Sequence, residues 1–224
     1  MATRQNKKPP QTSYEVLTAT LRNEIVSGNL PAGTRLTIEE IADRYTVSTM
    51  PVRQALQRLQ GEGIVDLLPR KGARVLPLDQ SLVSNIYDLR GAIEALLSRT
   101  SLPNITISAM ERLDRLHKEF AAAVDAKDSV RAFAINADFH RLIYSHAGNP
   151  MAMEIYDRYA GLLGALRSKY GTTQKLLRDR VQRVSDSLAA LHARDAVRLG
   201  QLAAEHCELS KGELLKLMDR ENEL

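Results

Sequence analysis

The stretch from Leu36 to Leu76 constrains the fold of this chain more than any other part of its sequence. It contains two short segments with helical periodicity, separated by a tight turn and followed by two short strand-like runs around a glycine. This order of elements is typical of a winged helix-turn-helix, a small module that reads DNA. The sequence therefore predicts a DNA-binding module in the first third of the chain.

Residue spacing defines the two helices of this module. Thr37, with Glu40 three positions later, forms a capping box at the start of the first helix. Its inner face is predicted to consist of Ile38, Ile41, Ala42 and Tyr45. Ser48 is the expected N-cap of the second helix, and Pro51 falls in its first turn, where a missing N–H costs nothing. The residues predicted to pack inward, at positions i, i+3, i+4 and i+7, are Val52, Ala55, Leu56 and Leu59.

The opposite face of the second helix is polar and basic. It is predicted to present Thr49, Met50, Arg53, Gln57 and Arg58. A helix with a polar first turn and exposed arginines suits the major groove of DNA, because side chains near the helix N-terminus reach base edges there.

A β-hairpin is predicted after this helix, from strands over residues 64–68 and 73–76. Its basic tip consists of Arg70, Lys71 and Gly72. Such a tip can lie along phosphates or enter the minor groove. The alternative for this segment alone is a surface hairpin with solvated charges.

The segments VSTMPVRQALQRLQGEGIVDLLPRKGARV and LRNEIVSGNLPAGTRL resemble the DNA-binding domain of the GntR family of bacterial transcription regulators. The resemblance covers residues 16–75. Family members typically carry an arginine after the serine and a threonine before the proline, where this chain has Thr49 and Met50, so the operator of relatives does not carry over. Arg53 occupies a family DNA-contact position. The predicted DNA contacts are Arg35, Thr37, Ser48, Thr49, Met50, Pro51, Arg53, Gln57, Arg58, Arg70, Lys71 and Gly72.

The positive charge of the chain is concentrated in this module. The formal net charge is +4 at pH 7; residues 1–78 hold 11 Lys and Arg against 7 Asp and Glu, whereas residues 79–224 hold 20 against 20. Phosphate neutralisation supplies most nonspecific DNA affinity, so this distribution fits a nucleic-acid module joined to a domain with another task. The alternative is that a small domain carries a few surplus charges by chance.

Length and composition favour two soluble domains. The chain has 224 residues, 44% hydrophobic and 26% charged. Cys207 is the single cysteine, which excludes an internal disulfide, and no apolar run approaches the ~20 residues of a membrane span. Basic residues near the N-terminus precede no hydrophobic core, so they do not form a secretory signal. We expect a cytoplasmic protein with a disordered arm over 1–12, a winged helix-turn-helix over 13–77 and a helical domain over 78–224.

The second domain is predicted to be an all-α antiparallel bundle of about six helices, which makes the whole chain mainly α. Asp79 is the expected N-cap of the first of these helices, and Ser108 with Glu111 forms a capping box for the second. The expected helices cover residues 81–101, 108–126, 128–147, 151–170, 172–193 and 195–218.

The segments IYDLRGAIEALLS, NADFHRLIYSHAGNP and LHARDAVRLGQLAAEHC resemble the helical effector domain, called FCD, of the FadR subgroup of GntR regulators. They span most of residues 79–210. The resemblance implies a pocket inside the bundle for a small organic acid. It also implies a divalent metal, often held by an Asp or Asn, a His four residues later and two histidines from later helices.

This chain meets the metal pattern only in part. Asn136 and His140 are spaced i, i+4, which places both side chains on one helix face. His206 matches the last family position, but Val184 stands where another histidine is usual and cannot bind a metal. Asn136, His140 and His206 would hold Zn, Ni or Mn weakly, because none of them is anionic. The alternative is that they are hydrogen-bonded polar groups lining an effector pocket.

Buried arginines are candidates for holding a carboxylate effector, because guanidinium offers two parallel donors. Arg90 follows the family's arrangement of an arginine four residues before Glu94. Arg180 and Arg183 border Val184 and can replace anchoring by a metal. The alternative for each arginine is a surface ion pair.

Three functions fit these features. The first is a transcriptional regulator, a repressor, that binds an operator with inverted-repeat half-sites as a homodimer and responds to a small carboxylate metabolite. The second is a metal-dependent hydrolase with an appended DNA module, which Val184 argues against. The third is a constitutive dimeric DNA-binding protein without an effector. We favour the first, with no catalytic residues and no membrane partner.

Overall fold

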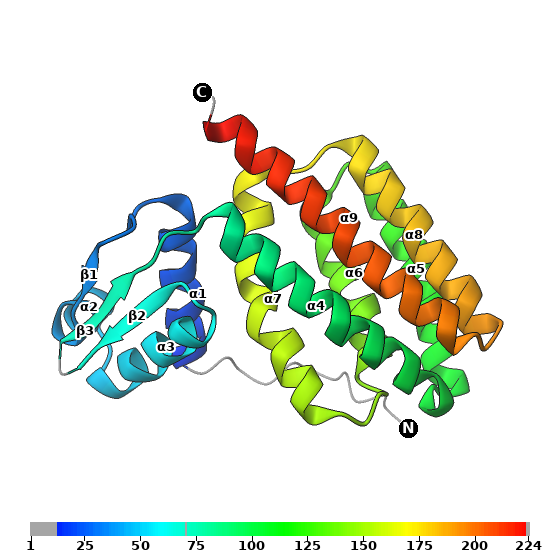
Figure 1. Cartoon of the computed structure of the whole chain (residues 1–224), viewed down its shortest axis with the longest axis horizontal. Coiled ribbons are helices and arrows are strands. Elements are labelled where there is room, and N and C mark those ends of the chain that lie inside the picture. Colours follow the sequence, from blue (N-terminus) through cyan, green and yellow to red (C-terminus); the bar gives the residue numbers. More distant parts are fainter. Residues whose placement is uncertain (1–12, 70, 223–224) are drawn as a thin grey trace, which may run out of the picture. The chain divides into compact units, whose positions relative to one another are not determined.

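The computed structural model of this chain describes residues 13–69 and 71–222 (Figure 1). These residues fall into two compact units that divide between Leu78 and Asp79. The arm predicted over residues 1–12 and the predicted DNA contact Arg70 lie outside the described residues.

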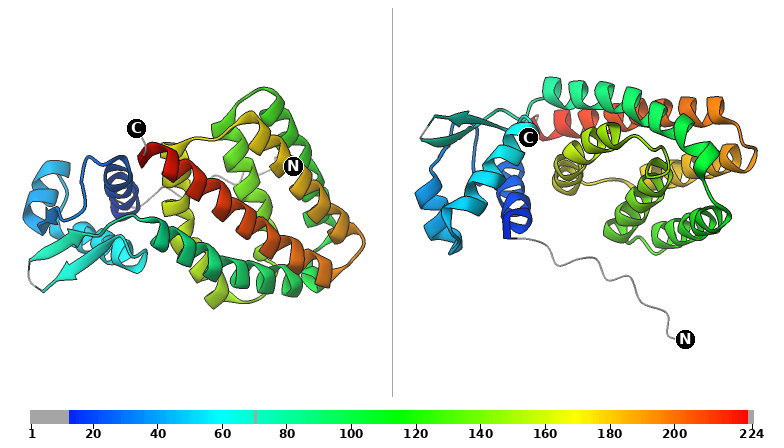
Figure 2. Two further views of the ribbon diagram at one scale, coloured as in Figure 1. Left: turned by 45° about the horizontal axis from the view of Figure 1, so that its top comes forward. Right: turned by 90° about the horizontal axis from the view of Figure 1, so that it is seen from below.

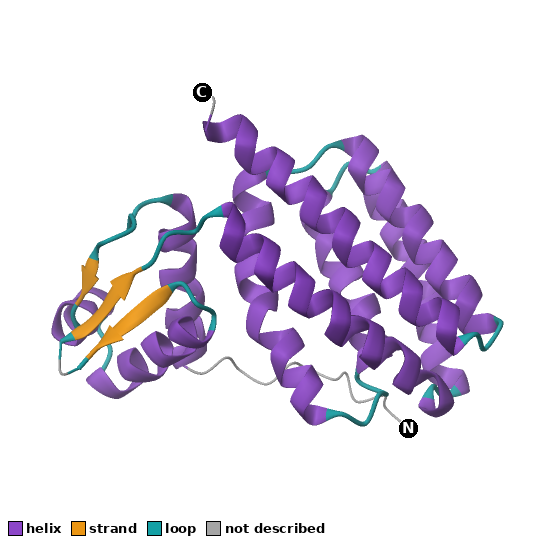
Figure 3. Ribbon diagram, viewed as in Figure 1, coloured by secondary structure: helices purple, strands orange, loops and turns teal. Residues whose placement is uncertain are grey.

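The N-terminal unit combines three helices with a small sheet, coloured purple and orange in Figure 3. Its elements are α1 (Ser13–Ser27), β1 (Arg35–Leu36), α2 (Ile38–Tyr45), α3 (Thr49–Gly61), β2 (Val65–Leu68) and β3 (Gly72–Val75). The strands are antiparallel in the order β1-β3-β2, so the predicted hairpin gains a third strand. Periodicity does not reveal β1, because two residues are too few to show alternation.

The core of this unit follows the predicted helix faces. Val52, Ala55, Leu56 and Leu59 of α3 are all buried, which confirms the predicted inner face. Thr37 caps α2 by accepting a hydrogen bond from the Glu40 N–H at 3.3 Å. Ser48 holds the N-cap position of α3, but its side chain makes no capping hydrogen bond. Part of its capping role was therefore predicted wrongly, and the Ser48 hydroxyl is exposed.

A buried ion pair joins α1 to the C-terminal end of α3. Glu62, the C-cap of α3, is fully buried. Arg22 of α1 donates to both of its carboxylate oxygens, from Nε at 2.7 Å and from Nη2 at 2.5 Å. Two parallel charge-assisted hydrogen bonds therefore connect the two helices.

The C-terminal unit is helical throughout its described residues, as predicted. Its elements are α4 (Gln80–Ser101), the short 3₁₀ helix η1 (Leu102–Asn104), α5 (Ile107–Asp125), α6 (Ser129–Tyr144), α7 (Pro150–Tyr170), α8 (Gln174–His192) and α9 (Ala196–Asn222). Figure 2 shows α4 and α9 side by side, as one layer over α5 to α8. Thr106, rather than the predicted Ser108, caps α5, because its hydroxyl accepts from the Ala109 N–H at 3.2 Å.

The core of this unit contains aromatic side chains from three helices. Phe120 of α5, Phe139 and Tyr144 of α6, and Tyr156 of α7 are buried in one cluster with many aliphatic residues. Within the described part of the chain, no helix is both long enough and apolar enough to cross a membrane.

Candidate functional site

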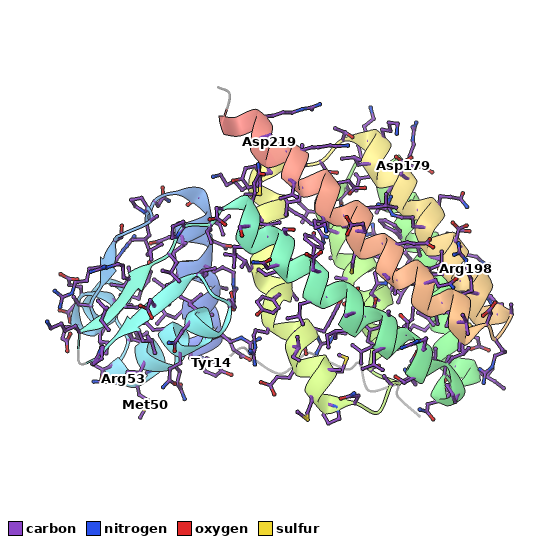
Figure 4. All side chains as sticks on the ribbon, viewed as in Figure 1. Tyr14, Met50, Arg53, Asp179, Arg198 and Asp219 are labelled. Carbon is purple, nitrogen blue, oxygen red and sulfur yellow. The ribbon has the colours of Figure 1, made fainter. Side chains whose placement is uncertain are left out.

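The outer face of α3 carries the exposed polar surface that the sequence predicts. Thr49, Met50, Arg53 and Gln57 are all exposed, and the Met50 side chain is 63% exposed. Figure 4 shows Met50 and Arg53 projecting from the outer side of this helix. No carboxylate of the described residues forms an ion pair with Arg53, so its guanidinium is free to meet an external anion.

Other predicted DNA contacts have structural partners in this unit. The Arg58 Nε atom lies 3.7 Å from Glu62 Oε1, and Thr37 donates its hydroxyl to Glu40 Oε2 at 2.6 Å. Pro51 is half-buried in the first turn of α3. The polar groups of Arg58 and Thr37 are therefore engaged within the protein, which leaves fewer of the predicted contacts available to a duplex.

Gly72 is buried at the start of β3 and supports the sheet. Its φ angle is +88°, and a Cβ atom at this position would lie 1.9 Å from the backbone oxygen of Leu36. The close approach of β1 to β3 therefore requires a glycine here.

Basic side chains also gather on the sheet. Arg35 and Lys71 are exposed, as their predicted role requires. Arg74 is exposed too and pairs with Arg35 in the β1–β3 register, with Asp66 as its partner on β2. Arg74 is not among the DNA contacts predicted from the sequence. Its proximity to Arg35 depends on strand β1, which the sequence did not predict.

A cavity of about 560 Å³ lies within the C-terminal unit. Its wall contains the five predicted effector contacts Arg90, Glu94, Asn136, His140 and His206. They come from α4, α6 and α9, which are far apart in the sequence. This volume falls in the range of about 300–1,000 Å³ that is typical of small-molecule sites.

Arg90 is already paired inside the protein. Its Nε atom donates to Glu94 Oε1 at 2.6 Å, and its guanidinium lies 4.6 Å from the ring centre of Tyr156. Burial lowers the pKa of Arg90, but the Glu94 carboxylate together with Tyr156, Cys207 and Tyr87 raises it overall. Tyr144 donates its hydroxyl to the other Glu94 oxygen at 2.8 Å. Arg90 thus has less capacity for an external carboxylate than its position in the sequence suggests.

His140 and Asn136, which line the cavity, each keep one buried acceptor without a partner among the described residues. Since the Tyr144 proton is donated to Glu94, the Tyr144 oxygen can accept from His140 Nδ1, 3.5 Å away. This assigns the imidazole proton to Nδ1 and leaves a lone pair on Nε2. His140 Nε2 and Asn136 Oδ1 are both buried without a hydrogen-bond partner among the described residues. Burial lowers the pKa of His140 to about 4, so this ring is neutral at pH 7.

These acceptors, together with His206, form a donor set for a divalent metal. The His206 ring centre lies 4.8 Å from that of His140. Burial, followed by the neighbouring His140, lowers the pKa of His206 well below its usual value, so it too offers a lone pair. Two imidazole nitrogens and one amide oxygen fit a divalent cation. Val184 is buried in the core and contributes nothing to this set.

The charge around this donor set does not favour a metal. Within the described part of the chain, no group of three or more His, Cys, Asp or Glu side chains is placed to hold one. The guanidinium groups of Arg180, Arg183 and Arg167 each lower the pKa of His206 through their charge. The same positive field opposes a divalent cation, so these residues fit a weakly held metal.

Arg180 and Arg183 share one carboxylate. Glu213 of α9 accepts from Arg180 Nη2 at 2.5 Å and from Arg183 Nη2 at 2.9 Å. Arg180 lines a small side pocket of about 10 Å³ rather than the main cavity. Arg183 lines neither of the two. Five of the seven predicted effector contacts thus line the main cavity, Arg180 lines the side pocket, and Arg183 is connected to Arg180 through Glu213.

Arg167 also lines the main cavity and was missed by the sequence prediction. It lies in the last turn of α7, where a basic residue is expected for its effect on the helix end alone. Nothing in the local sequence points to the cavity, because α4, α6 and α9 bring the other wall residues to this place.

Known proteins match both units. The family profile described as bacterial regulatory proteins, gntR family, matches residues 13–75, and that of the FCD domain matches residues 85–209, more than half of the chain. The HTH-type transcriptional repressor RspR of Escherichia coli K12 is 25% identical over 204 residues, covering 89% of this chain and 88% of its own. The HTH-type transcriptional repressor GlaR of the same strain is 26% identical over 196 residues, covering 83% and 88%. Among solved structures, E. coli McbR/YncC matches with a TM-score of 0.69 at 22% identity, over 92% of this chain and 99% of that one, which shows a shared fold.

Proposed function

Because this chain belongs to the GntR family of DNA-binding transcription regulators and carries an FCD domain, we propose that it is a repressor controlled by a small organic acid. Regulators of this family are not enzymes. The observation that carries the proposal is the 560 Å³ cavity, whose wall holds buried polar atoms without partners. Buried polar groups are normally satisfied, so such atoms favour a ligand.

The DNA-reading part of the proposal places α3 in the major groove. The exposed first turn of this helix, with Thr49 and Met50, faces the base edges, and Arg53 offers its guanidinium to a base or a phosphate. Arg35, Lys71 and Arg74 add phosphate contacts from the sheet. Two copies of the chain, as a homodimer, bind inverted-repeat half-sites.

The ligand-binding part of the proposal assigns the cavity to a small carboxylate. Effector binding changes operator affinity only if the ligand binds one state of the protein better than the other. Asn136, His140 and His206 would hold a Zn, Ni or Mn ion weakly, and that ion would supply a Lewis acid for a ligand carboxylate.

Arg53→Ala tests the DNA-reading part. Operator fragments are first selected from genomic DNA with the purified protein, and affinity is then measured by fluorescence anisotropy at fixed salt. We expect Arg53→Ala to weaken binding by about 1–3 kcal/mol, roughly 5- to 150-fold. Gln60→Ala, an exposed change at the far end of α3, is the matched control and should leave affinity unchanged. Equal affinities of Arg53→Ala and wild type would contradict this placement of α3.

A thermal-shift screen of organic acids tests the ligand-binding part. An acid that binds the folded protein raises its melting temperature, and the same acid should then change operator affinity. An acid that stabilises the protein without altering operator affinity would contradict control by that ligand.

A further inference from the structure

The charges around the main cavity do not balance. Of the residues that line the main cavity and the side pocket, only Glu94 and Glu213 are acidic. Glu94 is committed to Arg90, and Glu213 is shared between Arg180 and Arg183. One carboxylate therefore serves two guanidinium groups at the α8–α9 side of this unit.

Arg167 adds a further positive charge at the same place. Its Nη2 atom donates to the Tyr87 hydroxyl at 2.6 Å, and no described carboxylate pairs with it. Arg167 lines both the main cavity and the side pocket, so its guanidinium lies where they adjoin. With Arg180, Arg183 and Glu213, it leaves this buried cluster with an excess of two positive charges. Lys127, the remaining basic residue of the cavity wall besides the paired Arg90, is exposed to solvent.

Several donors of this cluster are unused. Arg180 is only 3% exposed, yet its Nε and Nη1 atoms have no hydrogen-bond partner among the described residues. Arg167 Nε and the Thr172 hydroxyl, which line the same side pocket, are likewise buried and unpartnered. Unpaired buried donors and charge are costly, so a counterion would stabilise this arrangement.

The electrostatics of Arg180 agree with this reading of the geometry. Burial, followed by the charge of Arg167, lowers the pKa of Arg180 to about 10 despite its bond to Glu213. A negative group between the two guanidiniums would remove this repulsion. His140 and His206, which also line the main cavity, are neutral at pH 7 and supply no competing positive charge.

We propose that the cavity takes a small organic dianion, a dicarboxylate or a phosphate monoester, whose charge is neutralised by Arg167 and Arg180, with Thr172 as a further donor. This inference rests on the proposed role of the cavity as an effector site and names the chemical class of the effector. A dianion balances the two excess charges, whereas a monoanion leaves one unbalanced. Guanidinium forks bind carboxylate and phosphate alike, so the chemistry of the site is shared by both ligand kinds.

The test is a titration of ligands into the full-length protein without DNA. Binding is monitored by the change in melting temperature at pH 7.5, with EDTA and at constant ionic strength. The probes are butyrate against succinate, benzoate against benzene-1,3-dicarboxylate, and glycerol 3-phosphate as the phosphate monoester. We expect at least one dianion to bind tenfold or more tightly than the monocarboxylates. Tighter binding of succinate or benzene-1,3-dicarboxylate identifies a dicarboxylate site, and tighter binding of glycerol 3-phosphate identifies a phosphate monoester site. The proposal would be overturned if none of the dianions bound more tightly than the monocarboxylates.

Arg167→Gln shows whether this site is the cause. It should weaken the preferred dianion at least tenfold and leave the ligand-free melting temperature unchanged or higher, because a charge without a carboxylate partner is removed. Arg178→Gln, an exposed change on α8 two residues from Arg180, is the control and should keep full affinity. Undiminished dianion binding by Arg167→Gln, or a lower ligand-free melting temperature, would refute the assignment. Because DNA is absent, the outcome is independent of whether the chain represses any operator.

Discussion

Replacing Glu62 by Gln is expected to destabilise the N-terminal unit by about 3 kcal/mol. Glu62 is fully buried, and both of its oxygens accept hydrogen bonds from Arg22, at 2.7 and 2.5 Å. Removing one partner of a buried ion pair costs about 3–5 kcal/mol, because the remaining charge loses its counterion. The Arg22 side chain keeps 12% exposure to water, so the lower end of that range applies.

Hydrogen exchange measured by mass spectrometry on the full-length chain is the suitable assay. It follows α1 and α3 separately from the rest of the molecule. A loss of about 3 kcal/mol predicts exchange about 150-fold faster at the slowest amides of these helices. Arg44→Gln is the matched control, because the Arg44 side chain is 55% exposed, and its partner Glu24 keeps the hydrogen bond from the Tyr45 hydroxyl when Arg44 is removed. Such a surface pair contributes less than about 1 kcal/mol.

Similar exchange in the Glu62→Gln and Arg44→Gln variants would refute the argument from burial. A double variant, Arg22→Met with Glu62→Leu, extends the test. It should recover most of the lost stability, because apolar side chains of similar volume can replace a buried ion pair. The double variant would also show whether the ion pair fixes the α1–α3 angle, since operator affinity would then fall although stability is restored.

Two further predictions follow from single residues. Gly72→Ala should lower the free energy of unfolding of the N-terminal unit, measured by urea denaturation, by about 2 kcal/mol or more, since its Cβ would meet the Leu36 backbone oxygen. Gly33→Ala has the same positive φ but open space around it, so an equal loss there would contradict the clash. Folding stability should fall as the pH drops from about 6.5 towards 4, because burial lowers the pKa of His140 to about 4 and the unfolded chain then binds more protons. His140→Gln should reduce the slope of the melting temperature against pH between pH 7 and 5, with buried His206 responsible for the remaining slope, and an unchanged slope would count against the buried neutral ring.

The sequence predicts the parts of this fold that are determined locally. The inner face of α3 follows from the spacing of Val52 and Leu59, because a helix places such positions on one side. Strand β1 was missed, since its pairing with β3 depends on residues almost forty positions away. The start of α5 was displaced because Thr106 and Ser108 are both good caps, and only the geometry of the chain selects Thr106.

The candidate site follows the same division. The common face of Asn136 and His140 comes from helical spacing, and so does the pairing of Arg90 with Glu94. Arg167 could not be predicted, because its place in the wall depends on how the end of α7 meets other helices. Sequence alone also cannot show that a side chain such as Arg90 already forms its hydrogen bonds inside the protein.

The resemblance to FCD domains implies a histidine where this chain has Val184. The absence of that histidine agrees with the positive charges of Arg167, Arg180 and Arg183. The absence of one imidazole weakens a metal site, while Arg167, Arg180 and Arg183, of which only the last two pair with Glu213, raise the positive potential that a divalent cation would have to enter. An anion entering the same cavity is instead attracted. Because arginine stays charged and His140 stays neutral above about pH 5, this attraction is nearly constant across the neutral range. A metal-anchored carboxylate would behave differently, since its affinity depends on the free metal concentration. The residues present therefore favour guanidinium over metal as the main holder of an acidic ligand.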